Sequence, residues 1–230
     1  GYLFIGQLAF EEASVENLYL PSTLNEIFDE AFVDATIENI HFENGSNLKL
    51  IGYESFQYAT LGDFVVPSSV IIIEAYAFRN SRFTSFTFEE NSELILLEQG
   101  AFSDSNLSSI TLPENLFSIE DDVFSDTLLT TITIPENIKR IEGYAFQGSL
   151  LDEVIMAGDN QWEFVSKSAF EGTPLKNNNT EELFIVGSIL DEYIQDDYTL
   201  AKDIIIPEGV TWISEGAFRY ESSPNVYEGY

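Results

Sequence analysis

The sequence predicts a mainly β solenoid, an elongated stack of short coils, and three observations lead to this fold class. A small residue followed by phenylalanine recurs along the chain at a nearly fixed interval. Two short apolar segments recur within each interval. Hydrophobic residues make up 44% of the chain, which argues against disorder despite the high charge. A repeat of this size can bury its apolar side only against neighbouring repeats, so a fixed period indicates a solenoid.

The small-phenylalanine pairs set the expected number of coils. Successive phenylalanines are 22, 24, 22, 24, 22, 22, 24 and 48 residues apart, and the last gap is two periods with one pair missing. Each ring is expected to fill the interior of its coil, while the small residue lets the backbone pass close. The pairs are Ala9-Phe10, Ala31-Phe32, Ser55-Phe56, Ala77-Phe78, Ala101-Phe102, Val123-Phe124, Ala145-Phe146, Ala169-Phe170 and Ala217-Phe218. They predict about nine coils of 22–24 residues.

The first apolar segment of each repeat reads apolar-x-x-apolar-x-apolar and is often closed by proline. Its last three residues alternate between inward and outward positions and are rich in β-branched and aromatic types, which predicts a short strand. A terminal proline ends the strand because it offers no N–H. The segments are Val15–Leu20, Ile37–Phe42, Leu61–Val66, Phe83–Phe88, Leu107–Leu112, Leu129–Ile134 and Leu151–Met156.

The second apolar segment reads apolar-x-x-apolar and precedes each phenylalanine, as in Leu24–Ile27, Val70–Ile73 and Ile138–Ile141. Polar residues or glycine separate it from the small-phenylalanine pair, which predicts either a tight turn or one turn of helix. The 24-residue repeats replace a short link, such as Pro113-Glu114-Asn115, by a longer polar loop, such as Glu43–Asn47.

Residues 171–203 break the period. Within them, Leu183–Val186, the pair Gly187-Ser188 and Ile189–Tyr193 predict a β-hairpin on a two-residue turn. The regular pattern returns at Ile204–Pro207. The expected organisation is one solenoid over residues 1–230 with a hairpin insertion at 171–203. We interpret it as a fragment of a longer chain because neither end reads as a polar cap.

These motifs together resemble the BspA-like, treponemal-type leucine-rich repeats, over essentially the whole chain. The resemblance rests on the strand segment closed by proline, the following apolar-x-x-Ile and the Ala-Phe pair. It implies a right-handed solenoid with a parallel sheet along one face. It also implies secreted or cell-surface proteins that bind host proteins, other bacteria or matrix, without shared catalytic residues. The residue directly after the second segment departs from the family, in which it is usually glycine. Here it is glycine at Gly52, but glutamate in four successive repeats, at Glu74, Glu98, Glu120 and Glu142.

The charge excludes several classes of partner. The formal net charge is −31, from 40 acidic and 9 basic residues, and the basic residues are scattered. Nucleic acids and anionic membrane surfaces both attract clustered Lys and Arg, so both partners are disfavoured. No apolar run reaches the roughly 18 residues of a membrane span, so we expect no membrane insertion in this segment.

The chemistry of an enzyme is also missing from the sequence. Zinc-type sites need several His or Cys ligands, but the chain has no Cys and a single histidine, His41. A serine–histidine–aspartate triad would have to use His41, which falls at an outward strand position. We therefore expect no enzyme and no cofactor, apart from the possible cation discussed below.

The outward positions of the first strand stack into a row that is almost free of charge. The candidate binding residues on it are Tyr19, His41, Ser85, Thr87, Ser109, Thr111, Thr131 and Thr133. Three successive hydroxyl-x-hydroxyl pairs also resemble the flat threonine arrays of ice-binding solenoids. The alternative is that threonine simply favours strands.

The middle positions of the second segment, normally polar, are apolar in four adjacent repeats. They are Leu50, Ile71, Ile72, Ile95, Leu96 and Phe117. If they are exposed, they form a contiguous patch of the kind that marks an interface, here a possible lateral interface between copies. The alternative is that the chain itself covers these strands.

Glu74, Glu98, Glu120 and Glu142 occupy equivalent places, each four residues before a phenylalanine. Stacking would put their like charges about 5 Å apart. Either the side chains splay into solvent, or a hard cation such as calcium bridges them. Asp121 and Asp122 lie beside the row and would complete the ligand shell.

The sequence favours an extracellular or cell-surface binding or adhesion protein that recognises a protein or matrix ligand. The rival interpretation is a structural segment of a fibre or surface layer, which would bind copies of itself laterally. An enzyme is a distant third, because no sequence feature supports it.

Overall fold

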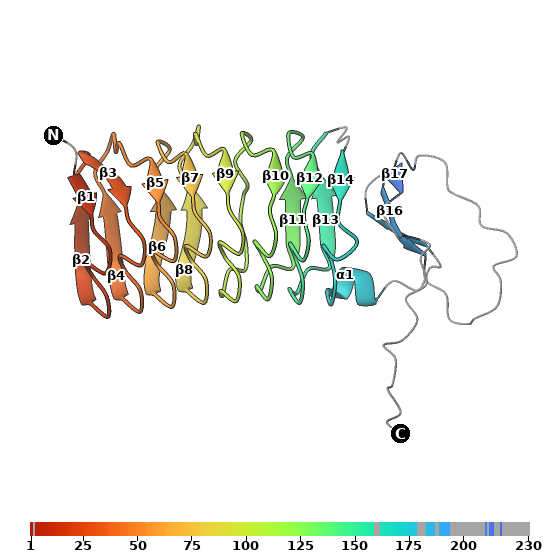
Figure 1. The fold of residues 1–230 in the computed structure, drawn as a ribbon, viewed down its shortest axis with the longest axis horizontal. Coiled ribbons are helices and arrows are strands. Elements are labelled where there is room, and N and C mark those ends of the chain that lie inside the picture. Colours follow the sequence, from red (N-terminus) through yellow and green to blue (C-terminus); the bar gives the residue numbers. More distant parts are fainter. Residues whose placement is uncertain are drawn as a thin grey trace, which may run out of the picture.

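A computed structural model of the chain describes residues 1, 3–158, 162–178, 183–186, 189–193, 210, 212–213 and 217. It confirms a mainly β solenoid whose coils succeed one another along its long axis from the N-terminus (Figure 1). Most coils contribute a longer strand to one parallel sheet and a shorter strand to another. We call these the long-strand sheet and the short-strand sheet.

The long-strand sheet contains four paired strands and, further along, two more. They are β2 (Ser14–Leu20), β4 (Thr36–Phe42), β6 (Thr60–Val66) and β8 (Arg82–Phe88), then β11 (Thr131–Ile134) and β13 (Glu153–Met156). All neighbouring strands in it run parallel, in register from coil to coil. Each of the six corresponds to a predicted first segment.

The short-strand sheet is likewise divided into two runs. The first run is β1 (Leu3–Ile5), β3 (Leu24–Ile27), β5 (Leu50–Ile51), β7 (Ile72–Ile73) and β9 (Leu96–Leu97). The second run is β10 (Ser118–Ile119), β12 (Arg140–Ile141) and β14 (Phe164–Val165). These parallel strands are the predicted second segments.

A column of stacked phenylalanine rings fills the interior between the two sheets. Seven successive pairs stack, with centroids 4.8 Å apart from Phe10 to Phe32 and 5.9 Å apart from Phe102 to Phe124. Phe32 and the six rings after it are fully buried. Burial of each such ring contributes roughly 1.5–3 kcal/mol. The column is therefore the main apolar support of the fold.

Each phenylalanine of the column from Phe10 to Phe146 sits between two tight turns rather than in a turn of helix. Glu54 and Tyr58, two residues on either side of Phe56, have φ of 51° and 59°. The backbone N–H of Phe56 donates to the Ala77 carbonyl of the next coil at 2.7 Å. Ser55, directly before the ring, is fully buried. A small residue is needed there because successive turns pack backbone against backbone.

The two repeat lengths differ in how their loops bond to the preceding coil. Where the 22-residue repeats have proline, two 24-residue repeats have glutamate. The Glu43 N–H donates to Leu20 at 2.9 Å, and its carboxylate accepts the Ser22 N–H at 2.7 Å. The latter bond lowers the pKa of Glu43. Glu89 accepts the Ser68 N–H at 2.8 Å in the same way. The longer loop therefore gains bonds that proline cannot form.

The predicted strand Leu107–Leu112 is wrong, although its apolar pattern is right. Leu107 and Leu112 are buried as expected. The Asn106 side chain, however, accepts the Phe83 N–H at 2.8 Å and donates to the Phe83 carbonyl at 3.0 Å. It occupies the place that a strand backbone would take. Within the described chain, residues 108–112 form no backbone hydrogen bond to either neighbouring coil, so the long-strand sheet is interrupted there.

The described part of the chain forms about seven turns of the solenoid, against the nine coils expected. Eight of the nine expected rings lie in it, and the ninth, Phe218, lies outside the described residues. A short helix, α1 (Pro174–Asn177), follows the last described ring. Helices in the described part of the chain are too short and too polar to span a bilayer.

The predicted hairpin strands are present. β15 (Leu183–Val186) and β16 (Ile189–Tyr193) pair antiparallel, with Val186 opposite Ile189. β16 also pairs parallel with β17 (Trp212–Ile213). Gly187 and Ser188, the predicted turn, lie outside the described residues.

Candidate binding surfaces

The outward face of the long-strand sheet carries an uncharged block of hydroxyl groups. Three consecutive coils present only serine or threonine at their three outward positions, and all of these residues are exposed. They are Thr84, Ser85, Thr87, Ser108, Ser109, Thr111, Thr130, Thr131 and Thr133. We call this set the hydroxyl row. It stands out in a chain whose net charge is −31.

Sequence reasoning found two of the three outward positions in each coil. Thr84, Ser108 and Thr130 lie directly after the first apolar residue of each segment, outside the alternating end that predicts a strand. The sequence motif could have identified them, since apolar-x-x-apolar-x-apolar has three non-apolar positions. The resemblance to a flat threonine array is not supported, because Ser109 and Thr111 lie in the interrupted coil. On either side of that coil, Ser85 lies opposite Asp63 and Thr131 lies opposite Glu153 on the neighbouring strand.

The N-terminal part of the same face carries an aromatic pair. The rings of Tyr19 and His41 stack with centroids 4.9 Å apart, and Tyr19 is 73% exposed. Beside them, Asn39 Nδ2 lies 3.2 Å from Asn17 Oδ1. His41 is therefore a surface residue of the sheet, as its outward position predicts. These side chains offer a partner a flat stacking surface and amide groups.

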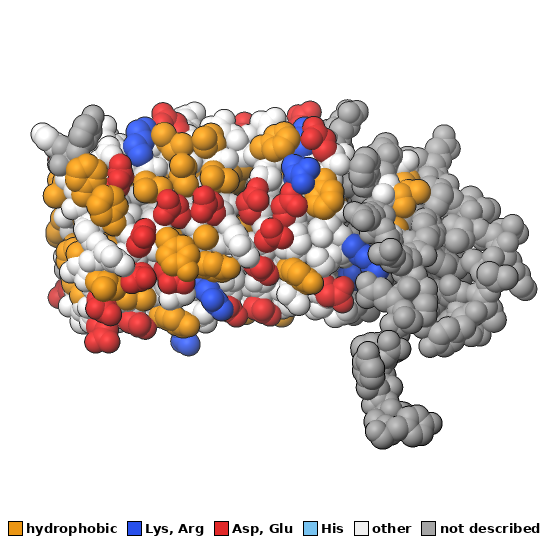
Figure 2. Space-filling model, in the orientation of Figure 1, with side chains coloured by type: hydrophobic (Ala, Val, Ile, Leu, Met, Phe, Trp, Pro, Cys, Tyr) orange, Lys and Arg blue, Asp and Glu red, His pale blue; other side chains and the backbone are white. Residues whose placement is uncertain are grey.

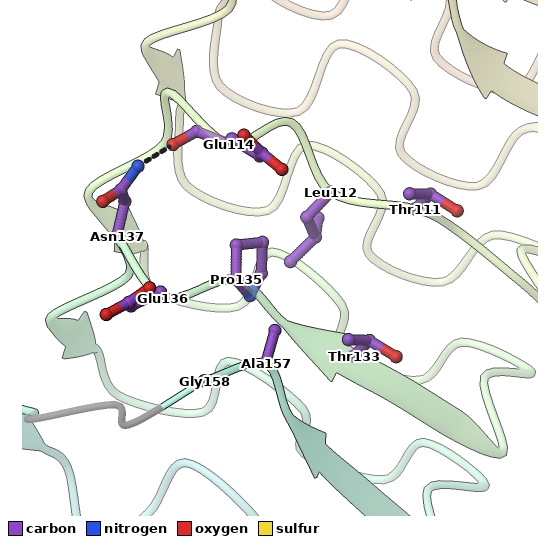
Figure 3. A pocket seen from close by; sticks show the side chains of 9 residues that line it. All are labelled: Thr111, Leu112, Glu114, Thr133, Pro135, Glu136, Asn137, Ala157 and Gly158. Atoms are coloured by element: carbon purple, nitrogen blue, oxygen red, sulfur yellow. Dashed lines mark hydrogen bonds between the residues drawn. The ribbon is translucent and has the colours of Figure 1, made fainter.

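Two hollows open where the strands of the hydroxyl row end. One has a volume of about 360 Å³, with Thr111 and Thr133 at its edge and Pro135 in its wall (Figure 3). Asn137 Nδ2 donates to the Glu114 carbonyl at 2.7 Å on its far side. The other has a volume of about 820 Å³ and lies between the Thr87 and Thr111 coils. The two hollows flank the coil that interrupts the sheet, so this part of the face can receive a projecting side chain.

The short-strand sheet presents the apolar residues predicted as a lateral interface. Leu50, Ile72 and Leu96 lie opposite one another on successive strands. Ile95 is 57% exposed and Phe117 is 49% exposed. Figure 2 shows hydrophobic side chains gathered over β5 and β7. The described part of the chain leaves these residues at least partly exposed, which favours a surface patch over strands covered by the chain. We call Leu50, Ile71, Ile72, Ile95, Leu96 and Phe117 the apolar row.

The four equivalent glutamates, the acidic row, follow the short strands at the same place in four successive coils. Figure 2 shows acidic side chains next to the hydrophobic ones on this side of the molecule. The four glutamates are held by hydrogen bonds rather than splayed into solvent. The Glu74 carboxylate accepts the Tyr53 N–H at 2.9 Å, and the Glu98 carboxylate accepts the Ala75 N–H at 3.1 Å. Each of these two bonds links a carboxylate to the preceding coil.

The last two glutamates of the row bond within their own strand region. Ser118 donates to the Glu120 carboxylate, and Arg140 pairs with Glu142 at 2.8 Å. Asp122 Oδ2 lies 3.4 Å from Gln99 Nε2. Within the described residues, no three carboxylate or histidine side chains converge on a point where they could hold a metal ion. The geometry gives the calcium site at Glu74, Glu98, Glu120, Glu142, Asp121 and Asp122 no support.

Burial raises the pKa of Glu74 above its usual value. The Tyr53 N–H opposes this shift, while Glu98 reinforces it. A carboxyl whose pKa is raised on folding binds its proton more tightly in the folded state, so its charge destabilises the fold at neutral pH. This contribution disappears as the pH falls through the folded pKa.

We therefore expect Glu74→Gln to raise the melting temperature at neutral pH. The amide oxygen can still accept the Tyr53 N–H, so the variant loses the charge and keeps the bond. The gain over the natural chain should shrink as the pH approaches about 4, the usual glutamate range. Thermal melts across this pH range test it, with the exposed loop variant Glu90→Gln as control. An equal gain from both variants would show only the effect of net charge.

The repeat pattern matches a known family model. The model of the BspA type leucine rich repeat region matches in six copies, over residues 3–97 and 72–187. Comparison with curated protein sequences found no significant match.

Several solved structures share the fold. A leucine-rich repeat protein from Bacteroides ovatus aligns with a TM-score of 0.63 at 23% identity, covering 92% of this chain and 49% of that one. The pneumococcal vaccine antigen PcpA aligns with a TM-score of 0.53 at 20% identity, covering 70% of this chain and 49% of that one. The chain therefore spans about half the length of each of these solved structures.

Proposed function

This chain belongs to the BspA-type leucine-rich repeat family, and on that premise we propose that it is a binding or adhesion module at the cell surface or outside the cell. Its ligand is a protein or matrix component, bound by the hydroxyl row. The uncharged, exposed hydroxyl block on a chain of −31 is the observation that carries this proposal. An interface core is typically depleted in charge, and among the described coils only these three carry no charge at their outward positions.

Two further features support the same face. The stacked Tyr19–His41 pair adds a rigid aromatic surface, a type that is enriched in interfaces. The hollows beside Thr111 provide concave sites for projecting side chains.

The proposal is tested by binding to a panel of purified extracellular-matrix proteins on a sensor surface. Thr87→Arg with Thr111→Arg places two bulky charges on the hydroxyl row without touching the core. We expect this pair to weaken binding about tenfold or more. Asn44→Arg with Gln99→Arg adds the same charge at exposed positions off the row and should bind normally. Equal loss in both pairs, or no binding by the natural chain, would count against the proposal.

Lateral self-association through the apolar row is the second candidate, favoured by the exposure of Ile95 and Phe117. If it is correct, the chain should sediment as a concentration-dependent oligomer, and Ile72→Glu with Ile95→Glu should make it monomeric. A monomer before and after mutation would remove the fibre or surface-layer role from consideration.

A further inference from the structure

The apolar row and the acidic row lie next to each other on the short-strand side, where Figure 2 shows hydrophobic and acidic side chains side by side. Ile72 faces outward between Leu50 and Leu96, and Glu74 follows it by two residues. The neighbouring coil repeats this arrangement with Leu96 and Glu98, about 4.8 Å away, whereas Leu50 is followed by Gly52 at the corresponding place. These two adjacent coils therefore present the same unit, an apolar side chain beside a carboxylate.

The acidic row has few cations of its own. In the described part of the chain, no Lys or Arg forms a salt bridge with Glu74, Glu98 or Glu120. The nearby Lys49 pairs instead with Glu93 at 3.0 Å. Glu74 and Glu98 receive only backbone N–H groups. Burial and the neighbouring Glu98 both raise the pKa of Glu74, while Arg140 pairs with Glu142 at the far end of the row.

The charge of the row decides which occupant fits the apolar row. A second copy of the chain would bring its own acidic row and another net charge of −31 to the interface. Like charges across an interface cost several kcal/mol and suppress that pairing. We infer that these stripes are a docking surface for a cationic, amphipathic segment of a protein partner. Its apolar side chains cover Ile72 and Ile95, while its Lys or Arg side chains meet Glu74 and Glu98.

This surface lies on the short-strand sheet, whereas the proposed ligand face lies on the long-strand sheet. The docking surface therefore does not depend on the hydroxyl row. Variants of one sheet test the docking surface and variants of the other test the ligand face, so one proposal can fail without the other. Electrostatic pairing predicts fast association that weakens with salt. If apolar contact also contributes, a cationic segment without apolar side chains should bind only weakly.

The probe for the test is a 12-residue peptide of alternating leucine and lysine, followed by fluorescence anisotropy on the full chain. A peptide of alternating serine and lysine has the charge without the apolar side, and one of alternating leucine and glutamate has the reverse charge. We expect the leucine–lysine peptide to bind at least about tenfold more tightly than either control, a difference of about 1.4 kcal/mol.

Matched variants locate the site. Ile72→Asn with Ile95→Asn, and separately Glu74→Gln with Glu98→Gln, should each weaken binding of the leucine–lysine peptide about tenfold. Val65→Asn with Ile155→Asn removes residues that are each 43% exposed on the other sheet, and should change binding less than about twofold. Glu16→Gln with Glu38→Gln is the matched charge control on that sheet.

Three outcomes would overturn the inference. The leucine–lysine peptide could fail to bind, or the variants on both sheets could weaken binding equally, which would indicate diffuse attraction to an acidic chain. Sedimentation could instead reveal a dimer that Ile72→Asn with Ile95→Asn dissociates, which would make a second copy the occupant. Selective loss on the short-strand sheet with a monomeric chain would support it.

Discussion

Phe102→Ala should lower the free energy of unfolding by about 3–5 kcal/mol, the usual cost of emptying a buried phenylalanine site. The Phe102 ring is fully buried, with its centroid 5.4 Å from that of Phe78 and 5.9 Å from that of Phe124. It also meets Phe86 edge-on at 4.8 Å. Neighbouring coils cannot close the gap, because the backbone turns on either side are already stacked.

Chemical denaturation followed by circular dichroism measures this loss. Phe117→Ala is the matched control, since its ring is 49% exposed on the short-strand sheet and should change stability by about 0.5 kcal/mol or less. Similar losses from the two variants would contradict the phenylalanine column as the main support of the fold.

Gly62→Ala is the second change with a large expected effect. A Cβ built on Gly62 would lie 2.0 Å from the backbone oxygen of Glu38 in the preceding coil. Backbone cannot rotate away as a side chain can, so β4 and β6 would have to separate. Overpacking of this kind costs about 1–3 kcal/mol, and the strain here falls directly on a parallel strand pair.

Gly6→Ala is the corresponding control, because a Cβ there would meet no other atom within 4 Å. The two variants should differ clearly in urea midpoint, with an unchanged slope if only the native state is strained. A Gly62→Ala chain as stable as the Gly6→Ala chain would show that the close approach is relieved at no cost.

The coil architecture could be predicted because apolar spacing reports burial directly. The period of the phenylalanine pairs placed every described ring of the column, and the two apolar segments placed both sheets. The sheet interruption could not be predicted, since Leu107 and Leu112 keep the apolar pattern and remain buried. Only the pairing is lost, through a side-chain amide that competes with backbone, and apolar spacing does not detect that competition.

The candidate surfaces were predicted less completely than the fold. The outward positions of Thr87 and Ile72 follow from the repeat pattern. Whether an outward residue stays exposed depends on whether another segment of the chain covers it. The pattern within a single repeat does not contain that information. The role of Glu74 was also hidden, because its partner is the Tyr53 N–H of the preceding coil. A bond between coils depends on turn geometry that residue types alone do not define.

The unpaired backbone of residues 108–112 has a consequence for how the solenoid loses its structure. In a repeat array, cooperativity is carried by interfaces between nearest neighbours. The coil at Asn106 keeps its ring stack but lacks the strand ladder on both sides. It is therefore the least tightly coupled junction in the described array. Under tension or dilute denaturant, the chain would come apart there into two blocks, each still folded, rather than unravelling from one end.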